Sequence, residues 1–300
     1  MLFALLTGTL ALSPIVQADT TLNAVRGQRL DVNAYAGEVT VHAWNRNAVR
    51  IVASGADQDQ LEISSSATAI SIRTHGRHGP PDEITLQISA PAWIAISMGG
   101  VNTNAKIEGI RAPISVETVE GEVDVTGGES LISLRSVQGS VRLRGAKGRI
   151  NVNSVNEDVE VANSSGDIAA QTVNGEILLQ GVNASSVDAN TVNGDISYSG
   201  PIRSGGRYAL STHNGDLTLT VPEGTSAGVT VSTFSGDFES EFPVPLRGTR
   251  KGKGFNFTLG SGSAQVTLES FQGTIQLVRP GSEEDPARRK REHDRDHDED

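Results

Sequence analysis

The sequence predicts an all-β fold, a parallel β-helix or β-solenoid of coils about 18–21 residues long, preceded by a less regular β-rich N-terminal cap. Three observations predict it: a recurring strand-turn-strand pattern, a nearly constant step between its copies, and the composition. Aromatic residues make up 4% of the 300 residues and hydrophobic residues 36%. A core of Val, Ile, Leu and Ala suits thin, closely stacked sheets.

The recurring pattern is clearest in residues 168–179. It reads apolar, any, apolar, any, Ser or Thr, apolar, polar, Gly, acid, apolar, any, apolar. We call its central apolar residue the anchor position. Copies are anchored at Tyr35, Val119, Val137, Val155, Val173, Val192, His213, Phe234 and Phe271. From Val119 onward the steps are 18, 18, 18, 19, 21, 21 and 37 residues, and a step near 20 is typical of stacked coils.

A series of β-hairpins is the alternative fold. Asn174-Gly175, Asn193-Gly194 and Asn214-Gly215 are dipeptides that favour two-residue hairpin turns. The extra residues fall between copies, as at 200–206, and the strand segments keep their lengths. Stacked coils require such a constant strand length and hairpins do not, so the spacing favours the solenoid.

In the predicted coil, two strands meet at a Gly corner and their alternating apolar residues point inward, for example Ile150 and Val152. Equivalent residues of neighbouring coils lie about 4.8 Å apart. Coils stacked in sequence order from Val119 to Phe234 would therefore extend over roughly 30–35 Å.

The N-terminal residues 1–18 are predicted to be a signal peptide. An apolar run is followed by Val16-Gln17-Ala18, which has the small-x-small form of a cleavage site, so we expect cleavage after Ala18. No Lys or Arg precedes the run, and the true start codon stays an open question. A buried strand or short core helix is the alternative. The chain has no Cys, which excludes a bacterial lipoprotein anchor at this site.

The mature chain is expected to have three parts. Residues 19–106 form the β-rich N-terminal cap, 107–279 the solenoid with an excursion at 240–264, and 280–300 a disordered charged tail. No later apolar stretch has transmembrane length. The net charge of −11 argues against nucleic acid as a partner.

The acid after the corner Gly forms a column in the stacked fold. The favoured interpretation is that these acids flank a turn and keep the surface soluble, and the alternative is a row of calcium sites. The calcium candidates are Glu122, Glu176, Asp195, Asp216 and Asp237, and Glu38 and Asp158 occupy the same position. A polar column before the Gly, which includes Asn174, Asn193 and Asn214, is expected to hydrogen-bond from coil to coil.

Motifs for catalysis are absent from the sequence. His75 and His78 share a loop, but they lack a third metal ligand. No Gly-x-Ser-x-Gly, His-Glu-x-x-His or P-loop pattern occurs. We therefore predict a non-enzymatic protein without a cofactor. The alternative enzyme is one that acts on polysaccharides with paired carboxylates.

The repeats also resemble the bacterial putative-adhesin domain family of unknown function. The resemblance rests on residues 37–44, on the many Thr/Ser-Val-x-Gly-acid copies and on residues 260–275, and it runs from about residue 20 to 279. It implies an exported β-solenoid and carries over no catalytic residues. Glu157 in place of a corner Gly and the charged tail depart from the pattern.

Together these observations predict an exported binding or adhesion module, periplasmic or at the cell surface, with a surface polysaccharide or an envelope protein as partner. The excursion carries four bases in an otherwise acidic protein, and these are the candidate binding residues: Arg247, Arg250, Lys251 and Lys253. The alternative is a structural scaffold that self-associates through open β edges.

Overall fold

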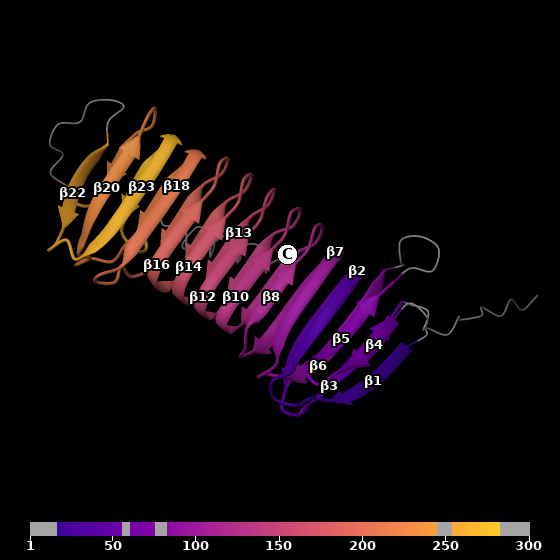
Figure 1. The fold of residues 1–300 in the computed structure, drawn as a ribbon. Helices are drawn as coiled ribbons and strands as arrows, with labels where there is room; N and C mark the ends of the chain where they lie inside the picture. Colours follow the sequence, from indigo (N-terminus) through magenta and orange to yellow (C-terminus); the bar gives the residue numbers. More distant parts are fainter. Residues whose placement is uncertain (1–16, 56–60, 76–82, 245–253, 283–300) are drawn as a thin grey trace, which may run out of the picture.

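The computed structural model describes residues 17–55, 61–75, 83–244 and 254–282. These residues form strands and turns, with no helix among them, and hence none that could cross a membrane. The strands lie side by side along one axis and give an elongated molecule (Figure 1). The predicted all-β solenoid is confirmed.

Each coil of the central stack contributes one strand to each of two layers. The first layer contains β8 (Ile114–Glu117), β10 (Glu129–Arg135), β12 (Lys147–Asn153), β14 (Ser165–Gln171), β16 (Asn183–Asn190) and β18 (Arg207–Asn214). The second layer contains β9 (Val123–Gly127), β11 (Val141–Arg144), β13 (Val159–Ala162), β15 (Ile177–Gln180), β17 (Ile196–Ser199) and β19 (Leu217–Thr220). All of these strands pair in parallel with the equivalent strand of the next coil.

The register of the parallel pairs gives the coil length. Ile150 pairs with Ile168, Ile168 with Val187, and Val187 with Tyr208. These steps are 18, 19 and 21 residues, which confirms coils of 18–21 residues. The register shift between Gly166 and Asp167 accommodates the first extra residue, as expected for a bulge that leaves the rest of the strand paired.

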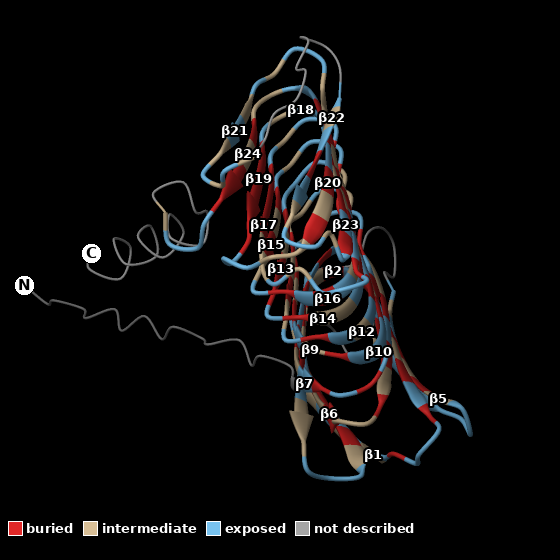
Figure 2. Cartoon of the chain, turned by 90° about the vertical axis from the view of Figure 1, so that its left-hand side faces the viewer, coloured by how far each residue is buried: buried red, intermediate tan, exposed pale blue. Residues whose placement is uncertain are grey.

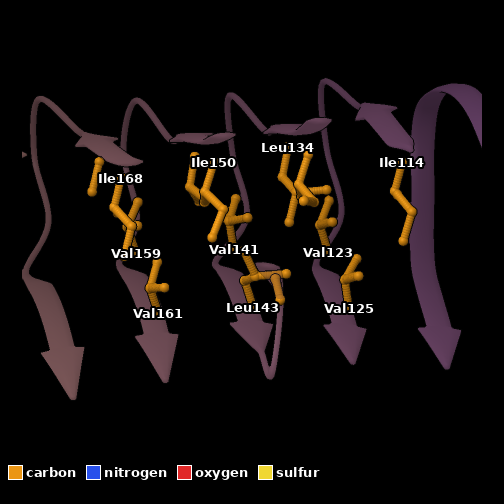
Figure 3. Packing of buried hydrophobic residues seen from close by; sticks show 14 of the residues in the cluster. Ile114, Val123, Val125, Leu134, Val141, Leu143, Ile150, Val159, Val161 and Ile168 are labelled. Carbon is orange, nitrogen blue, oxygen red and sulfur yellow. The ribbon is translucent and has the colours of Figure 1, made fainter. Parts of the chain in front are cut away.

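The core lies between the two layers and consists of columns of aliphatic side chains. Ile132, Ile150 and Ile168 of the first layer face Val141 and its equivalents in the second, and all are at most 2% exposed. Figure 3 shows Ile150 and Ile168 of the first layer pointing toward Val141 and Val159 of the second. Figure 2 shows buried residues along the strands, where they alternate with intermediate and exposed residues. One coil could not bury this face alone, so the neighbouring coils stabilise one another.

The C-terminal coils do not stack in sequence order, and this corrects the expected succession from Val119 to Phe234. The last coil, β23 (Ala264–Gln272) with β24 (Ile275–Val278), pairs in parallel with β18 and β19. On its other side it pairs with the preceding coil, β20 (Ala227–Thr233) with β21 (Phe238–Ser240). The last coil is therefore inserted between two earlier ones, as the order β18, β23, β20 in Figure 1 shows.

A strand from the described part of the excursion at 240–264 closes this end of the stack. This strand, β22 (Phe255–Leu259), pairs antiparallel with the outer side of β20. Phe238, Phe255 and Phe257 form a ring cluster there, with centroids 5.0–6.2 Å apart. An antiparallel strand interrupts the parallel repeat, so β22 acts as the cap that a solenoid end requires.

The N-terminal strands close the other end. β2 (Arg29–Trp44) and β7 (Ala95–Ile110) run through both layers and pair in parallel, so that parallel stacking begins before the expected boundary at residue 107. β5 (Ala69–Thr74) and β6 (Ile84–Pro91) lie outside β2, also in parallel. The outermost strands are antiparallel: β4 (Leu61–Ser65) on β5, β3 (Ala48–Ser54) on β6, and β1 (Gln17–Asn23) on β3.

Two buried tyrosines hold the insertion at 200–206. The Tyr198 hydroxyl donates to the Pro201 carbonyl at 3.1 Å, and the Tyr208 hydroxyl donates to the Ala184 carbonyl at 2.7 Å. Their rings pack edge to face with centroids 5.7 Å apart. Burial, with the neighbouring Tyr208, raises the pKa of Tyr198 above its ordinary value of 10.0, because a phenolate in an apolar core loses its hydration.

Stability is therefore expected to fall at alkaline pH. Because the pKa of Tyr198 is raised by folding, the folded chain keeps its proton at pH values where the unfolded chain has released it. The contribution of Tyr198 to the free energy of unfolding is therefore complete below the pKa of the unfolded chain and is lost as pH rises above that pKa. The loss is at most about 1.4 kcal/mol per pH unit above about pH 10. Urea unfolding at several pH values would measure it. Tyr198→Phe removes the titrating group, and equal slopes for the variant and the natural chain would contradict the assignment.

Candidate functional site

The anchor residues form a row along one corner of the solenoid, where first-layer strands turn into second-layer strands; Val137 and Val155 are half-buried and the others are exposed. We call this row the apolar ridge; it contains nine predicted anchors and Val101, which the sequence pattern missed. In spatial order the ridge is Tyr35, Val101, Val119, Val137, Val155, Val173, Val192, His213, Phe271 and Phe234. Its exposed large hydrophobic members are 40–64% accessible. Ten positions at about 4.8 Å make a ridge roughly 43 Å long.

In most coils a Ser or Thr before the anchor turns inward, and this places the anchor outside. Thr191 donates its hydroxyl to the Gly175 carbonyl of the previous coil at 3.1 Å, and Thr212 donates to Gly194 at 2.9 Å. Successive strand residues point to opposite sides. A buried, bonded hydroxyl at one position therefore exposes the next. The same bond recurs from Ser136 to Gly121, Ser154 to Gly139, Thr172 to Glu157 and Ser270 to Gly215.

The coil with Val101 satisfies the same geometry with two residues exchanged. Gly100 stands at the usual Ser/Thr position and Thr103 at the usual Gly position. The buried Thr103 hydroxyl donates to the Ala34 carbonyl at 3.0 Å. A Cβ on Gly100 would lie 2.7 Å from the Thr103 Cβ. The exchange preserves the hydroxyl and the space that it needs, but it hides the copy from a pattern search.

The corner glycines allow the coils to approach closely. A Cβ on Gly215 would lie 2.0 Å from the Gly194 carbonyl oxygen, and one on Gly194 would lie 1.9 Å from that of Gly175. Such contacts are far shorter than a van der Waals distance, so these positions accept no side chain without movement of the neighbouring backbone. The ridge residues therefore sit on a closely stacked, rigid corner.

The polar column beside the ridge forms a hydrogen-bonded ladder, as predicted. The Asn174 amide donates to the Asn156 side-chain oxygen at 3.1 Å, Asn193 donates to Asn174 at 2.9 Å, and Asn214 donates to Asn193 at 2.8 Å. The amides of Asn174 and Asn193 both donate and accept in the ladder, which fixes their orientation. The ladder makes this side of the ridge structurally uniform over four coils.

Carboxylates of the acid column bond to backbone amides of the next coil. Asp158 accepts from the Glu176 N–H at 2.7 Å, Asp195 from the Asp216 N–H at 2.8 Å, and Asp216 from the Thr274 N–H at 2.6 Å. Each bond satisfies a donor at the start of a second-layer strand. The acids thus have a structural role that the sequence did not predict.

The calcium candidates are only partly brought together. Glu176, Asp195 and Asp216 belong to successive coils. Two coils, those of Ser140 and Asp158, lie between Glu122 and Glu176, and the coil of Thr274 lies between Asp216 and Asp237. Glu122 pairs with Arg142 at 3.1 Å. Among the described residues no three His, Asp or Glu side chains form a group that could hold a metal ion.

Two shallow depressions lie beside the ends of the ridge. One, of about 410 Å³, lies beside the ring stack and is bordered by Ser211, Ser232 and Glu269 of the first layer. In the stack the Phe271 ring lies 4.6 Å from the His213 ring and 4.7 Å from the Phe234 ring. The other depression, of about 420 Å³, is lined by Tyr35, Val101 and Val119 with polar neighbours. The ridge therefore combines apolar contact area with nearby hydrogen-bonding groups.

The predicted basic binding residues are not among the residues that the structure describes. Arg247, Arg250, Lys251 and Lys253 all fall in residues 245–253, outside the described ranges, and they stay a prediction. The apolar ridge itself was not predicted as a site. Its signal was present in the sequence, since Val or an aromatic residue recurs at a turn position between Ser/Thr and Asn-Gly.

Comparison with known proteins gives one family match. Residues 114–278 match the model of a family described as Toastrack DUF4097, which is more than half of the 300 residues. No curated protein matches the chain. The matched range extends from the first residue of β8 to the last residue of β24, so it contains most of the ridge.

Several solved structures are similar to this chain. A putative adhesin from Bacteroides fragilis NCTC 9343 is 11% identical, with a TM-score of 0.43 over 88% of this chain and 97% of that one. A putative lipid binding protein from Parabacteroides distasonis ATCC 8503 is 10% identical, with a TM-score of 0.44 over 87% and 96%. A putative adhesin from Parabacteroides merdae ATCC 43184 is 11% identical, with a TM-score of 0.41 over 87% and 96%.

Proposed function

The chain belongs to the family described as Toastrack DUF4097, and from that premise we propose that it is a non-enzymatic binding module of the cell envelope that docks its partner on the apolar ridge. The single observation that carries this proposal is the exposure of Val, Tyr and Phe side chains at the same position of successive coils. Isolated exposed hydrophobic residues are common, but a contiguous apolar row marks an interaction surface.

The rigidity of the ridge supports a role in recognition. Buried hydroxyl bonds, corner glycines and the Asn ladder hold its residues at a fixed spacing. A preorganised surface loses little conformational entropy when it binds. The depressions at Tyr35 and at Phe234 add polar groups that would give specificity.

An extracytoplasmic location is part of the proposal. It rests on the apolar N-terminal run and on the Val16-Gln17-Ala18 motif. Residues 1–16 lie outside the described ranges. A surface polysaccharide or an envelope protein is the expected partner. Mass spectrometry of the protein recovered from the periplasm or medium would test export, since cleavage after Ala18 leaves Asp19 as the first residue.

Binding is tested with the mature protein, residues 19–300, on a glycan array and in an envelope pull-down, with and without calcium. Capture of one defined component supports the module. Capture that requires calcium would assign the acid column Glu176, Asp195 and Asp216 as a metal site. A shift to larger species with concentration, without capture, would favour the self-associating scaffold. Hydrolysis of a captured polysaccharide would favour the enzyme.

Polar substitution of the ridge is expected to weaken capture at least tenfold. The exposed Val119, Val173 and Val192 are changed together to Thr, which keeps the β-branched shape and removes apolar contact area. Leu131→Thr is the matched control, because Leu131 is 51% exposed but lies away from the ridge. Titration of the captured component measures the effect. Equal affinity of the triple variant and the natural chain would contradict the ridge as the docking surface.

A further inference from the structure

A second surface lies at the opposite corner of the solenoid, at its N-terminal end. Three turns meet there: 24–28 before β2, 45–47 after β2, and 92–94 before β7. The exposed or half-buried large side chains of these turns and of the adjoining strand end define the Arg–Trp patch. It contains Val25, Arg26, Trp44 at the end of β2, Arg46 and Trp93, with Arg111 in the next coil. Both Trp residues of the chain lie in this patch.

Each tryptophan of the patch carries an arginine over its ring. The Arg26 guanidinium lies 5.4 Å from the centre of the Trp93 ring, and the Arg46 guanidinium lies 5.2 Å from that of Trp44. Stacking on a ring fixes the guanidinium plane and leaves its N–H edge free to bind an anion. The two arginines are therefore held ready for anionic groups.

Hydrogen bonds join the three turns into one unit. The Trp93 indole N–H donates to the Asn47 side-chain oxygen at 3.3 Å, and the Asn47 carbonyl accepts from the Ala24 N–H at 3.0 Å. The Trp44 indole N–H donates to the Ala48 carbonyl at 2.7 Å. Both rings are half-buried, and with their N–H groups satisfied internally the parts that remain exposed are mainly apolar.

The turn that carries Val25 and Arg26 is itself fixed. The buried Gln28 side chain accepts from the Val25 N–H at 2.8 Å and donates to the Ser66 carbonyl at 2.6 Å. Gly27 has φ +97°, which a Gly adopts without strain. The turn thereby holds Val25, which is 64% exposed, beside the two arginines.

The charge of the patch is opposite to that of the whole protein. The chain carries −11, yet the patch has three arginines. In the described part of the chain, no ion pair neutralises Arg26, Arg46 or Arg111, whereas Arg29 and Arg50 nearby are paired with Asp31 and Asp19. Arginine, tryptophan and an exposed aliphatic residue together are the side chains that favour the interface of an anionic bilayer.

We propose that the Arg–Trp patch docks the protein on the surface of a membrane that contains anionic phospholipid. The arginines bind headgroup phosphates, and Val25 with the edges of the indole rings enters the interfacial layer. The patch precedes the first-layer strands β2 and β7, while the apolar ridge follows the ends of such strands. A protein docked in this way directs its ridge away from the bilayer, toward a partner.

The two tryptophans provide the test, because they are the only ones in the chain and both report on the patch. Vesicles of phosphatidylglycerol and phosphatidylcholine are titrated into the mature protein at low salt. We expect co-sedimentation with the vesicles, a blue shift of the Trp emission, and quenching by lipids brominated on the acyl chain. Binding should weaken as salt is raised, because the attraction is screened.

The decisive variant is Arg26→Glu with Arg46→Glu, for which we expect partitioning to fall at least tenfold. Arg73→Glu with Arg135→Glu is the control of equal charge change; both residues are exposed and stand at strand ends near the ridge corner. The control should bind like the natural chain. No binding to anionic vesicles, equal binding to pure phosphatidylcholine, or an equal loss in both variants would overturn the proposal.

Discussion

Gly215→Ala is expected to lower the free energy of unfolding by about 3 kcal/mol or more. The new Cβ would lie 2.0 Å from the Gly194 carbonyl oxygen and 2.5 Å from its carbon. Both atoms are backbone atoms of the neighbouring coil, so no side chain can rotate away. The same carbonyl accepts the Thr212 hydroxyl at 2.9 Å. Moving it apart would weaken that bond and the coil contact together.

Gly228→Ala is the matched control. Gly228 also has an ordinary backbone conformation, and the nearest atom to its added Cβ is 3.8 Å away. It should be neutral or gain up to about 1 kcal/mol, because Ala restricts the unfolded chain. Urea unfolding of both variants measures the difference. Equal stability of the two would show that the corner spacing is looser than the structure has it.

The role of the corner glycines was only partly predictable from the sequence. Their recurrence indicated a corner, but the reason for Gly, a carbonyl of the neighbouring coil in the place of a side chain, required coordinates. Glu157 illustrates the difference. Gln138 and Asn174 each form an isolated β-bridge to a neighbouring coil, whereas Asn156, next to Glu157, forms none. At that corner the Glu157 N–H donates to the Ser154 hydroxyl at 3.3 Å, while the Asn156 N–H still donates to the Val137 carbonyl at 3.2 Å. The Glu157 carbonyl still accepts the Thr172 hydroxyl at 3.0 Å.

The exposure of the ridge was predictable in principle and was missed. Apolar residues at period two were assigned to the core, correctly for Ile150 and Val152. The anchor position continues beyond that alternation, and a buried Thr or Ser hydroxyl takes the inward place beside it. Polarity alone could not reveal this, because a Thr hydroxyl bonded to a backbone carbonyl is readily buried.

The position of the last coil could not be predicted from the periodicity. The steps to His213 and Phe234 are both 21 residues. A step of this length fits a coil that lies next to the preceding one and also a coil that lies two strand spacings away from it. Parallel pairing depends on matching side chains and not on succession in the chain. The stacked rings of His213, Phe271 and Phe234 illustrate this match. The 37-residue step was the only indication of an exchanged order.

Ending the chain at Gly260 is expected to unfold the C-terminal third of the stack and cause aggregation. The deletion removes β23 and β24, including Val266, Leu268, Ile275 and Leu277, which are at most 2% exposed. Burial of such side chains stabilises by about 2 kcal/mol each, a large share of the total stability of a domain. It would also leave β18 and β20 with open edges that face an empty space.

Coils stacked in sequence order would respond differently to the same deletion. Phe271 would then belong to the terminal coil, and its loss would leave the coils up to Phe234 paired. Circular dichroism and hydrogen exchange of the β18 amides separate the two cases. The inserted order predicts loss of protection in β18 and β20, whereas retained protection in both would contradict it.

Cysteine cross-linking decides the order directly, since the natural chain has no Cys. Glu269 pairs in register with Ser211 on one side and with Ser232 on the other. Ser211→Cys with Glu269→Cys should therefore form a disulfide, because adjacent strands are about 4.8 Å apart. Ser211→Cys with Ser232→Cys should not, because two strand spacings, about 9.6 Å, exceed the reach of a disulfide. The reverse result would restore sequence order and place Phe234 directly against His213, without Phe271 between them on the ridge.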